Sequence, residues 1–114
     1  MNPPANHFYL AVGKLAHEGG YHMKNDEALN RVQRGVARLG LDWTDIVGPV
    51  RKRRFTDARK MVSYFLREQG WTFKDIGDVM HRDHATAMHH TRTLFHLMEF
   101  EEETRRRYID FCSA

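Results

Sequence analysis

Apolar residues recur at intervals of three and four along most of this sequence, which is the pattern of helices that bury one face. The first such stripe predicts a helix over residues 6–18 that ends at Gly19-Gly20. The second predicts a helix over residues 26–39, and Gly40 suits its end because glycine readily takes the left-handed conformation found there. The two stripes consist of Phe8, Val12 and Leu15 and of Leu29, Val32, Val36 and Leu39.

The middle of the chain predicts two further helices. A short turn of helix covers residues 43–47 and stops before Pro49, whose ring disfavours a helical residue in front of it. A longer helix covers residues 57–69, with Thr56 as its N-cap and Gly70 after its end. This longer helix is expected to have one core face and one polar face, the latter formed by Arg59, Ser63 and Arg67.

The next part of the chain combines a short helix, a tight turn and a longer helix. Thr72 is a good N-cap for a helix that runs to about residue 79, because Asp75 lies three residues later as in a capping box. The chain then turns at residues 80–82, and a second helix starts near Asp83 and reaches Met98. Two helices joined by a short turn are the pattern of a helix-turn-helix. The predicted core face of the second helix consists of Ala87, Met88, Thr91, Leu94, Phe95 and Met98, and its outer face of Ala85, Thr86, His89, Arg92 and Thr93.

A final helix is predicted over residues 101–111. Three glutamates there precede three arginines by four residues, a spacing that stabilises a helix by a few tenths of a kcal/mol per pair. The pattern as a whole predicts an all-α helix-turn-helix domain of five to six helices over residues 25–114, preceded by a helical extension over residues 1–24. The three pairs are Glu101–Arg105, Glu102–Arg106 and Glu103–Arg107.

The charge of the chain is informative through its distribution. A length of 114 residues fits one domain, and a hydrophobic fraction of 41% is enough for a core. The formal net charge of +3 would not by itself establish a nucleic-acid partner. Residues 51–67, however, hold seven cations and the single acid Asp57, so they create a local positive field whose commonest target is the phosphates of duplex DNA. The acidic residues gather elsewhere, at Glu99 and Glu101–Glu103.

The remaining composition bears on where the protein works. Cys112 is the single cysteine and therefore forms no internal disulfide, which is typical of a reducing compartment. No apolar run approaches the roughly 20 residues needed to cross a bilayer, and Met1-Asn2-Pro3-Pro4 lacks the order of a signal peptide. We therefore expect a cytoplasmic, nucleoid-associated protein that has no membrane partner.

Several of these residues resemble a known family. Asp75-Ile76-Gly77, followed by Arg82-Asp83-His84-Ala85-Thr86 and then His89, is similar to the signature of the C-terminal DNA-binding domain (domain IV) of the bacterial replication initiator DnaA. The likeness covers about residues 36–109. It implies a Trp-repressor-like all-α fold that binds double-stranded DNA at a sequence related to the initiator boxes, in replication control or transcription. Two departures are Ala85, where the signature has threonine, and a turn before Arg82 that is one residue shorter.

The resemblance implies that Asp83, His84 and Ala85 meet base edges in the major groove. A carboxylate can accept a hydrogen bond from a cytosine amino group, an imidazole can donate or accept, and the alanine methyl can contact a thymine methyl. Arg51 aligns with a loop arginine that enters the minor groove in the family, with Arg53 and Arg54 as alternatives. The implied phosphate contacts are Arg53, Arg54, Arg59, Arg67, Lys74, Arg82, Thr86 and His89. Without the resemblance, Asp83 is a helix cap, and packing against the core is an alternative for His84, which lies nearer the core side of the helix. A capping carboxylate can still accept from a base.

Three other functions were weighed against DNA binding. Eight histidines suggest a metalloenzyme, but among His81, His84, His89, His90 and His96 only the first two have a spacing that zinc on a helix uses, and no acid–base dyad is evident. Gly13-Lys14-Leu15 does not match a phosphate loop, so we predict no nucleotide. From the histidine spacing and the missing dyad we also predict no metal, no cofactor and no catalysis. The alternative that stays open is a protein-interaction module that modulates or competes with the replication initiator, docking on a replication protein through residues 1–24.

Overall fold

Six α-helices make up the part of the chain that the computed structural model describes, residues 25–114, and this part contains no β-strand. The predicted all-α class of five to six helices is confirmed, and most helix bounds lie within one or two residues of those expected. The predicted extension over residues 1–24, with its helix over residues 6–18, lies outside the described residues. The helices are α2 (Asn25–Arg38), α3 (Trp43–Val47), α4 (Arg53–Glu68), α5 (Phe73–Met80), α6 (His84–Phe100) and α7 (Glu102–Cys112).

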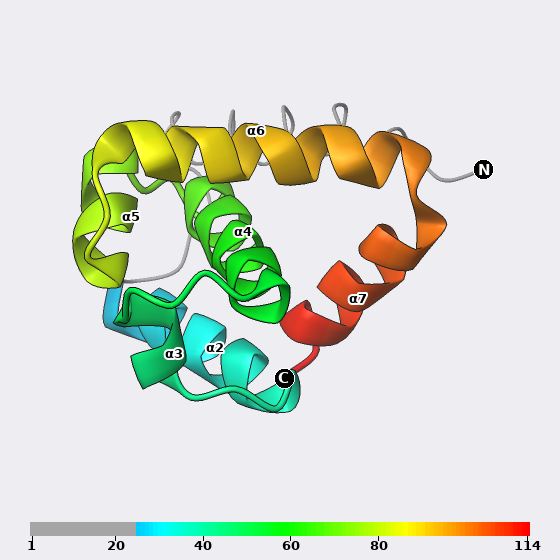
Figure 1. Cartoon of the computed structure of the whole chain (residues 1–114), viewed down its shortest axis with the longest axis horizontal. Helices are drawn as coiled ribbons and strands as arrows, with labels where there is room; N and C mark the ends of the chain where they lie inside the picture. The colour runs from blue at the N-terminus through cyan, green and yellow to red at the C-terminus, as the bar shows by residue number, and fades with distance from the viewer. Residues whose placement is uncertain (1–24) are drawn as a thin grey trace.

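α4 is the central helix, and the others pack around it (Figure 1). α6 crosses it along one side, α5 and α3 lie to its left in Figure 1, and α2 and α7 pack against its remaining sides. Every residue from Met61 to Leu66 is buried, so α4 has no polar face exposed to solvent along its middle. The prediction that Arg59, Ser63 and Arg67 form an outer face is therefore wrong for the first two, which are 1% and 0% exposed.

The start of α4 also differs from the prediction. The helix begins at Arg53 with Lys52 as its N-cap, so Thr56 lies inside the first turn and caps nothing. Its hydroxyl Oγ1 instead donates to the carbonyl of Arg53 at 3.0 Å, the alternative use of a threonine in a helix. Half of the basic run is consequently helical, and Arg53 and Arg54 extend from the first turn of α4.

α7 folds back beneath α6 and joins α2 to α4 (Figure 1). The ring of Tyr108 meets Tyr64 edge-on at 5.1 Å between centroids, and Phe111 meets Phe65 at 6.4 Å. Gly35 on α2 makes room for this contact, because a Cβ there would lie 2.6 Å from the Phe111 ring. The C-terminal helix is thus part of the core of the domain.

The charged face of α7 is close to the prediction. The pairs Glu102–Arg106 and Glu103–Arg107 are present at 3.8 and 3.9 Å. The third predicted pair is wrong, because Arg105 donates to the carbonyl of Met98 and Glu101 accepts from the hydroxyl of Thr104 at 2.7 Å. None of the helices within residues 25–114 is long and apolar enough to cross a membrane.

Candidate nucleic-acid interface

α5, the turn and α6 form a helix-turn-helix whose ends are closed by specific caps. The hydroxyl of Thr72 accepts from the backbone N–H of Asp75 at 3.1 Å, as the sequence predicts for the start of α5. His81 ends that helix in the left-handed conformation, with φ of 58°. The next N–H, of Arg82, donates to the carbonyl of Gly77 at 2.8 Å. The turn is therefore fixed by backbone hydrogen bonds on both sides.

Gly77 brings α5 into backbone contact with the start of α6. A Cβ at this position would lie 2.5 Å from the carbonyl oxygen of Arg82 and 2.9 Å from that of Asp83. Backbone atoms cannot move aside as the end of a long side chain can, so the position accepts only glycine in this arrangement. The contact sets the direction in which the first turn of α6 points.

Asp83 is the N-cap of α6. Its Oδ1 accepts from the backbone N–H of Thr86 at 2.8 Å, and this hydrogen bond holds the pKa of the Asp83 carboxyl below its usual range. The side chain is exposed and is also hydrogen-bonded by the side chain of Thr86, but an ionised carboxylate has about four acceptor sites, so some stay unused. One carboxylate can therefore cap the helix and still offer an acceptor to a partner.

The first turn of α6 projects its side chains into solvent. His84 and Ala85 are both exposed, as is His89 one turn later, and Thr86 is half-buried. The reading of His84 as a packed histidine is wrong, because the residues that face the core of α6 begin only at Ala87. The structure thus brings Asp83, His84 and Ala85 together on one exposed helix end.

Arg59 does not belong to this surface, and its prediction as a phosphate contact is wrong. Its guanidinium is buried and donates to three backbone carbonyls at the end of α3: Ile46 at 2.9 Å, Asp45 at 2.8 Å and Gly48 at 2.9 Å. Carbonyls at a helix C-terminus are left without partners in the helix and carry partial negative charge, which a cation satisfies. Arg59 therefore holds α3 against α4.

Arg82 has a related role that the sequence did not reveal. Its guanidinium donates to the carbonyl of Gly48 at 2.6 Å and to that of Met80 at 3.0 Å. Gly48 thus accepts from both Arg59 and Arg82, so the loop after α3 is tied to the helix-turn-helix. The half-buried Arg82 positions the loop that leads to Arg51 next to the exposed end of α6.

The basic run divides into two parts. Arg51 is exposed, and it belongs to the loop and not to α4. Arg54 faces the turn after α2, donating to the carbonyl of Gly40 at 3.5 Å, and Arg53 pairs with Asp57 at 3.8 Å. Lys52, Arg53 and Arg54 also line a hollow between α4 and α7. Arg51 is therefore the member of the run that stands apart from this hollow.

Two further predicted phosphate contacts, Lys74 and Arg67, differ in the exposure of their side chains and in the partners of their charged groups. Lys74 is exposed and pairs only with Asp78, at 3.0 Å, which raises its pKa. Arg67 is half-buried, donates to the carbonyl of Trp71 at 2.9 Å and lies 4.3 Å from the Phe73 ring centre. Lys74 thus presents an exposed charge, whereas Arg67 is held by a backbone carbonyl and an aromatic ring.

His90 is a half-buried histidine on α6, outside the predicted DNA-contacting residues. Burial, followed by the nearby cations Lys60, Arg59 and Arg82, lowers its pKa to about 4. His90 is therefore neutral at pH 7, and its Nδ1 is buried without a hydrogen-bond partner. Within residues 25–114, no three His, Cys, Asp or Glu side chains gather as a metal site would require.

Comparison with known proteins gives one match. The family described as the bacterial DnaA protein helix-turn-helix matches residues 30–94, more than half of the chain. The matched range contains α3, α4 and α5 whole and the first part of α6, and so includes the exposed helix end and the loop beside it. Searches of curated proteins and of solved structures gave no match.

Proposed function

Because the chain belongs to the family of bacterial DnaA helix-turn-helix domains, we propose that it binds a specific double-stranded DNA site related to the boxes of the replication initiator. DNA binding as such is what the helix-turn-helix of this family does. One observation carries the finer proposal: the first turn of α6 is exposed, is capped by Asp83 and is fixed in direction by the contact at Gly77.

In this proposal α6 enters the major groove with its leading end. A B-DNA major groove is about 12 Å wide and admits one helix, whose first residues reach the base edges. Asp83 accepts a hydrogen bond from a cytosine amino group at an acceptor site that its cap does not use. His84 forms a hydrogen bond with a purine or carbonyl edge. Ala85 has only a methyl group, so we expect it to favour thymine by apolar contact and not by a hydrogen bond.

Arg51 would read the neighbouring minor groove. An arginine suits a narrow A·T groove because the negative potential is concentrated there. The loop that carries it is tied to the turn before α6 through Gly48, so the two reading elements keep a fixed separation. We assign the sequence-independent contacts to phosphates to Arg53, Arg54, Lys74, Thr86 and His89, with Arg67 and Arg82 positioning their neighbours. Phosphate contacts set the register on the duplex without reading sequence.

The biological role that follows is control of replication or of transcription at such sites. A domain that occupies initiator-like boxes would compete with, or assist, a protein that uses the same boxes. The alternative function, a protein-interaction module that docks through residues 1–24, rests on residues outside the described part of the chain.

Selection of bound duplexes from a random pool tests the proposal. The wild-type protein should recover one motif, and His84→Ala should lose preference at one position. Asp83→Ser is a sharper test than alanine, because serine is as good an N-cap as aspartate but is shorter and uncharged. It should keep α6 intact while relaxing selection at a cytosine by about 1–3 kcal/mol.

His96→Ala is the matched control. His96 is an exposed histidine on the same helix, but it lies 12 residues beyond His84, or about 18 Å along the axis at about 1.5 Å per residue. This variant should recover the wild-type motif. Recovery of the unchanged motif by both Asp83→Ser and His84→Ala would remove these residues from base recognition, and absence of any selected motif would overturn site-specific binding.

A further inference from the structure

A basic hollow lies between the start of α4, the end of α2 and α7. Its volume is about 630 Å³, within the range in which proteins bind ligands and side chains of partners. Its apolar lining is formed by Leu39, Leu41, Ala58 and Met61, and its polar lining by Lys52, Arg53, Arg54, Arg107 and Asp57. The hollow therefore offers an apolar surface surrounded by four cations and one carboxylate.

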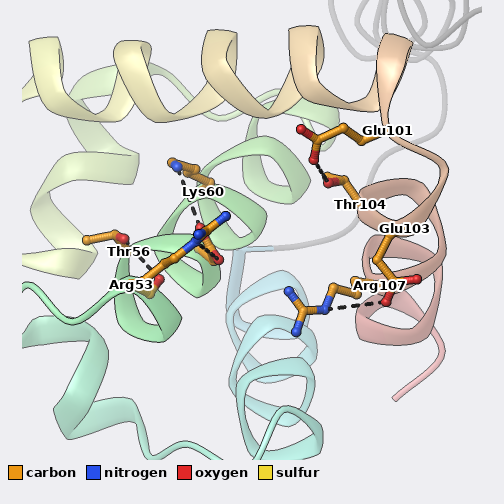
Figure 2. A network of polar contacts seen from close by, with 8 residues as sticks. Arg53, Thr56, Lys60, Glu101, Glu103, Thr104 and Arg107 are labelled. Carbon is orange, nitrogen blue, oxygen red and sulfur yellow. Dashed lines mark hydrogen bonds and ion pairs between the residues drawn. The ribbon is translucent and has the colours of Figure 1, made fainter.

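The positive charge of the basic hollow is only partly neutralised by the described residues. Asp57 is shared between Arg53 at 3.8 Å and Lys60 at 3.6 Å. Figure 2 shows Arg107 extending from α7 toward α4. Among the residues that the structure describes, it pairs with Glu103 of its own helix, at 3.9 Å. The side chain of Arg53 is 95% exposed. These weak surface pairs leave the cations available to an acidic partner.

The same chain carries a surface of the opposite character. At the corner where α6 passes into α7, Phe100 is 82% exposed, the highest exposure among the large apolar residues described. Glutamates stand on both sides of it, at Glu99 and at Glu101–Glu103. We call residues 99–103 the acidic corner. An exposed aromatic residue is the kind of side chain that anchors interfaces, where buried aromatic groups dominate the binding energy.

We propose that the acidic corner of one copy of this protein docks into the basic hollow of a second copy. Phe100 would lie on Leu39, Leu41 and Met61, and its flanking glutamates would meet the four cations. The two surfaces are complementary in charge and in apolar character, and both are carried by every molecule.

Such a contact joins two different surfaces, so it is heterologous. One copy uses its corner and the next its hollow, which permits dimers and longer head-to-tail arrays. A single anchor in a pocket is a small interface, and small interfaces are weak. Its charge complementarity also makes it sensitive to salt, because the Debye length falls from about 10 Å at 0.1 M to about 3 Å at 1 M.

Sedimentation equilibrium of the full chain without DNA tests this contact. We expect the associated fraction to grow as the protein concentration is raised to about 1 mM. Two copies bound at neighbouring sites on one DNA have a local concentration of this order. It should weaken when salt is raised from about 0.1 to about 1 M. Phe100→Ser should weaken association by about tenfold or more, since it removes the anchor. Its far-ultraviolet circular dichroism and melting temperature should match the wild type, because Phe100 supports no core contact.

Ile109→Ser is the matched control. Ile109 is also an exposed apolar residue, at 64%, on α7, but it lies outside the acidic corner and does not line the hollow. This variant should associate like the wild type. If it weakens association as much as Phe100→Ser, or if the wild type stays monomeric throughout, the proposal is overturned.

Charge reversal tests the pairing of the two surfaces directly. Arg107→Glu reverses a cation of the hollow, and Glu102→Arg reverses an acid of the corner. Each variant alone should associate about tenfold more weakly than wild type. An equimolar mixture should associate again at low salt, because the unaltered corner of Arg107→Glu meets the unaltered hollow of Glu102→Arg, and the new arginine meets the new glutamate. A mixture that associates no better than its components would refute the contact. Phe100, Glu102 and Arg107 lie outside the proposed DNA surface, whereas Arg53 and Arg54 of the hollow are assigned to phosphates. Association is therefore measured without DNA, and its failure would leave the proposed DNA binding untouched.

Discussion

Arg59 and Glu68 are both buried ionisable residues on α4, but their surroundings satisfy them to different degrees. Arg59 is 1% exposed and donates to three backbone carbonyls of the α3 end. Glu68 is 5% exposed; its Oε1 accepts from the hydroxyl of Tyr108, and its Oε2 is buried without a hydrogen-bond partner. The guanidinium in the first half of α4 thus has three hydrogen-bond acceptors, whereas the carboxyl at the end of α4 has a donor to only one of its two oxygens among the described residues.

The difference shows in which charge state each residue prefers. Burial lowers the pKa of Arg59, but arginine titrates so far above neutrality that it stays a cation. Burial raises the pKa of Glu68 from 4.5 to about 7, more than the Tyr108 hydroxyl can offset. A buried charge is therefore a permanent structural element where α4 meets α3 and a titrating one where α4 meets α7.

Replacing Arg59 should have the largest effect. Arg59→Met keeps the length of the side chain but leaves three buried carbonyls with fewer donors, each at a cost of about 1–3 kcal/mol. We expect the free energy of unfolding to fall by about 3–5 kcal/mol, measured by urea denaturation at constant m-value. DNA affinity should fall as well, because the loop to Arg51 loses its support. A loss below about 1 kcal/mol would contradict the view that this charge is structural.

The next effect concerns Glu68 and pH. Because its folded-state pKa is raised, the folded protein binds the extra proton, and stability is lost as pH rises from 4.5 to about 7. The loss amounts to about 3 kcal/mol, at about 1.4 kcal/mol per pKa unit. Glu68→Gln cannot titrate, so it should remove this loss, and urea midpoints measured across the range would show it.

His90 acts in the opposite direction and must be separated from Glu68. Its pKa is lowered from 6.5 to about 4, so stability that depends on neutral His90 is lost as pH falls through that window. Between about pH 4.5 and 6.5 the two residues oppose each other. The wild type should therefore show a shallow pH dependence there, and Glu68→Gln should show stability that rises with pH. A fall with pH in this variant would contradict the assignment.

Tyr108→Phe should have a smaller effect that also depends on pH. It removes the hydrogen bond to Glu68 while keeping the ring that packs on Tyr64. At pH 8 the ionised carboxylate is left buried without this donor, and we expect a loss of about 1–3 kcal/mol. At pH 5 the protonated carboxyl needs the donor less, so the loss should shrink. Equal losses at both pH values would indicate that only packing has changed.

The smallest effect is expected at a surface charge. Arg38 joins α2 to α7 through Asp110 at 2.9 Å, with both side chains about half exposed. Arg38→Ala should cost less than about 1 kcal/mol, and about 0.15 M salt should reduce that further. It is the control for Arg59→Met, since both replacements remove an arginine that links two elements and differ in burial.

The sequence predicts the helices well because their signals are local. Thr72 was predicted as an N-cap because Asp75 follows it by three residues, and Asp83 because it stands at the start of the next helix; the structure confirms both caps. The exposed first turn of α6 was expected from the family resemblance, whereas the helical pattern alone placed His84 nearer the core. Local spacing also predicted where α6 turns its core face, since Ala87, Leu94 and Met98 are buried.

The mistakes concern residues whose partners are distant in the sequence. Arg59 has the spacing of a solvated stripe, and nothing near it in the sequence shows that the carbonyls of residues 45–48 will surround it. Thr56 has the chemistry of an N-cap, but a hydroxyl inside a helix can donate backward instead. A glycine inside a helical pattern is the one signal that was available for Gly77, since it often marks close backbone approach.

The contact at Gly77 has a consequence for redesign of the protein. Since carbonyls of the turn touch α5 directly, α6 cannot be tilted on the domain by small changes in packing. New DNA-sequence preferences must therefore come from replacing the exposed side chains at positions 84 and 85 while the orientation of α6 stays the same. A library confined to those two codons should yield altered specificities with undiminished folding, whereas variation at position 77 should yield unfolded chains.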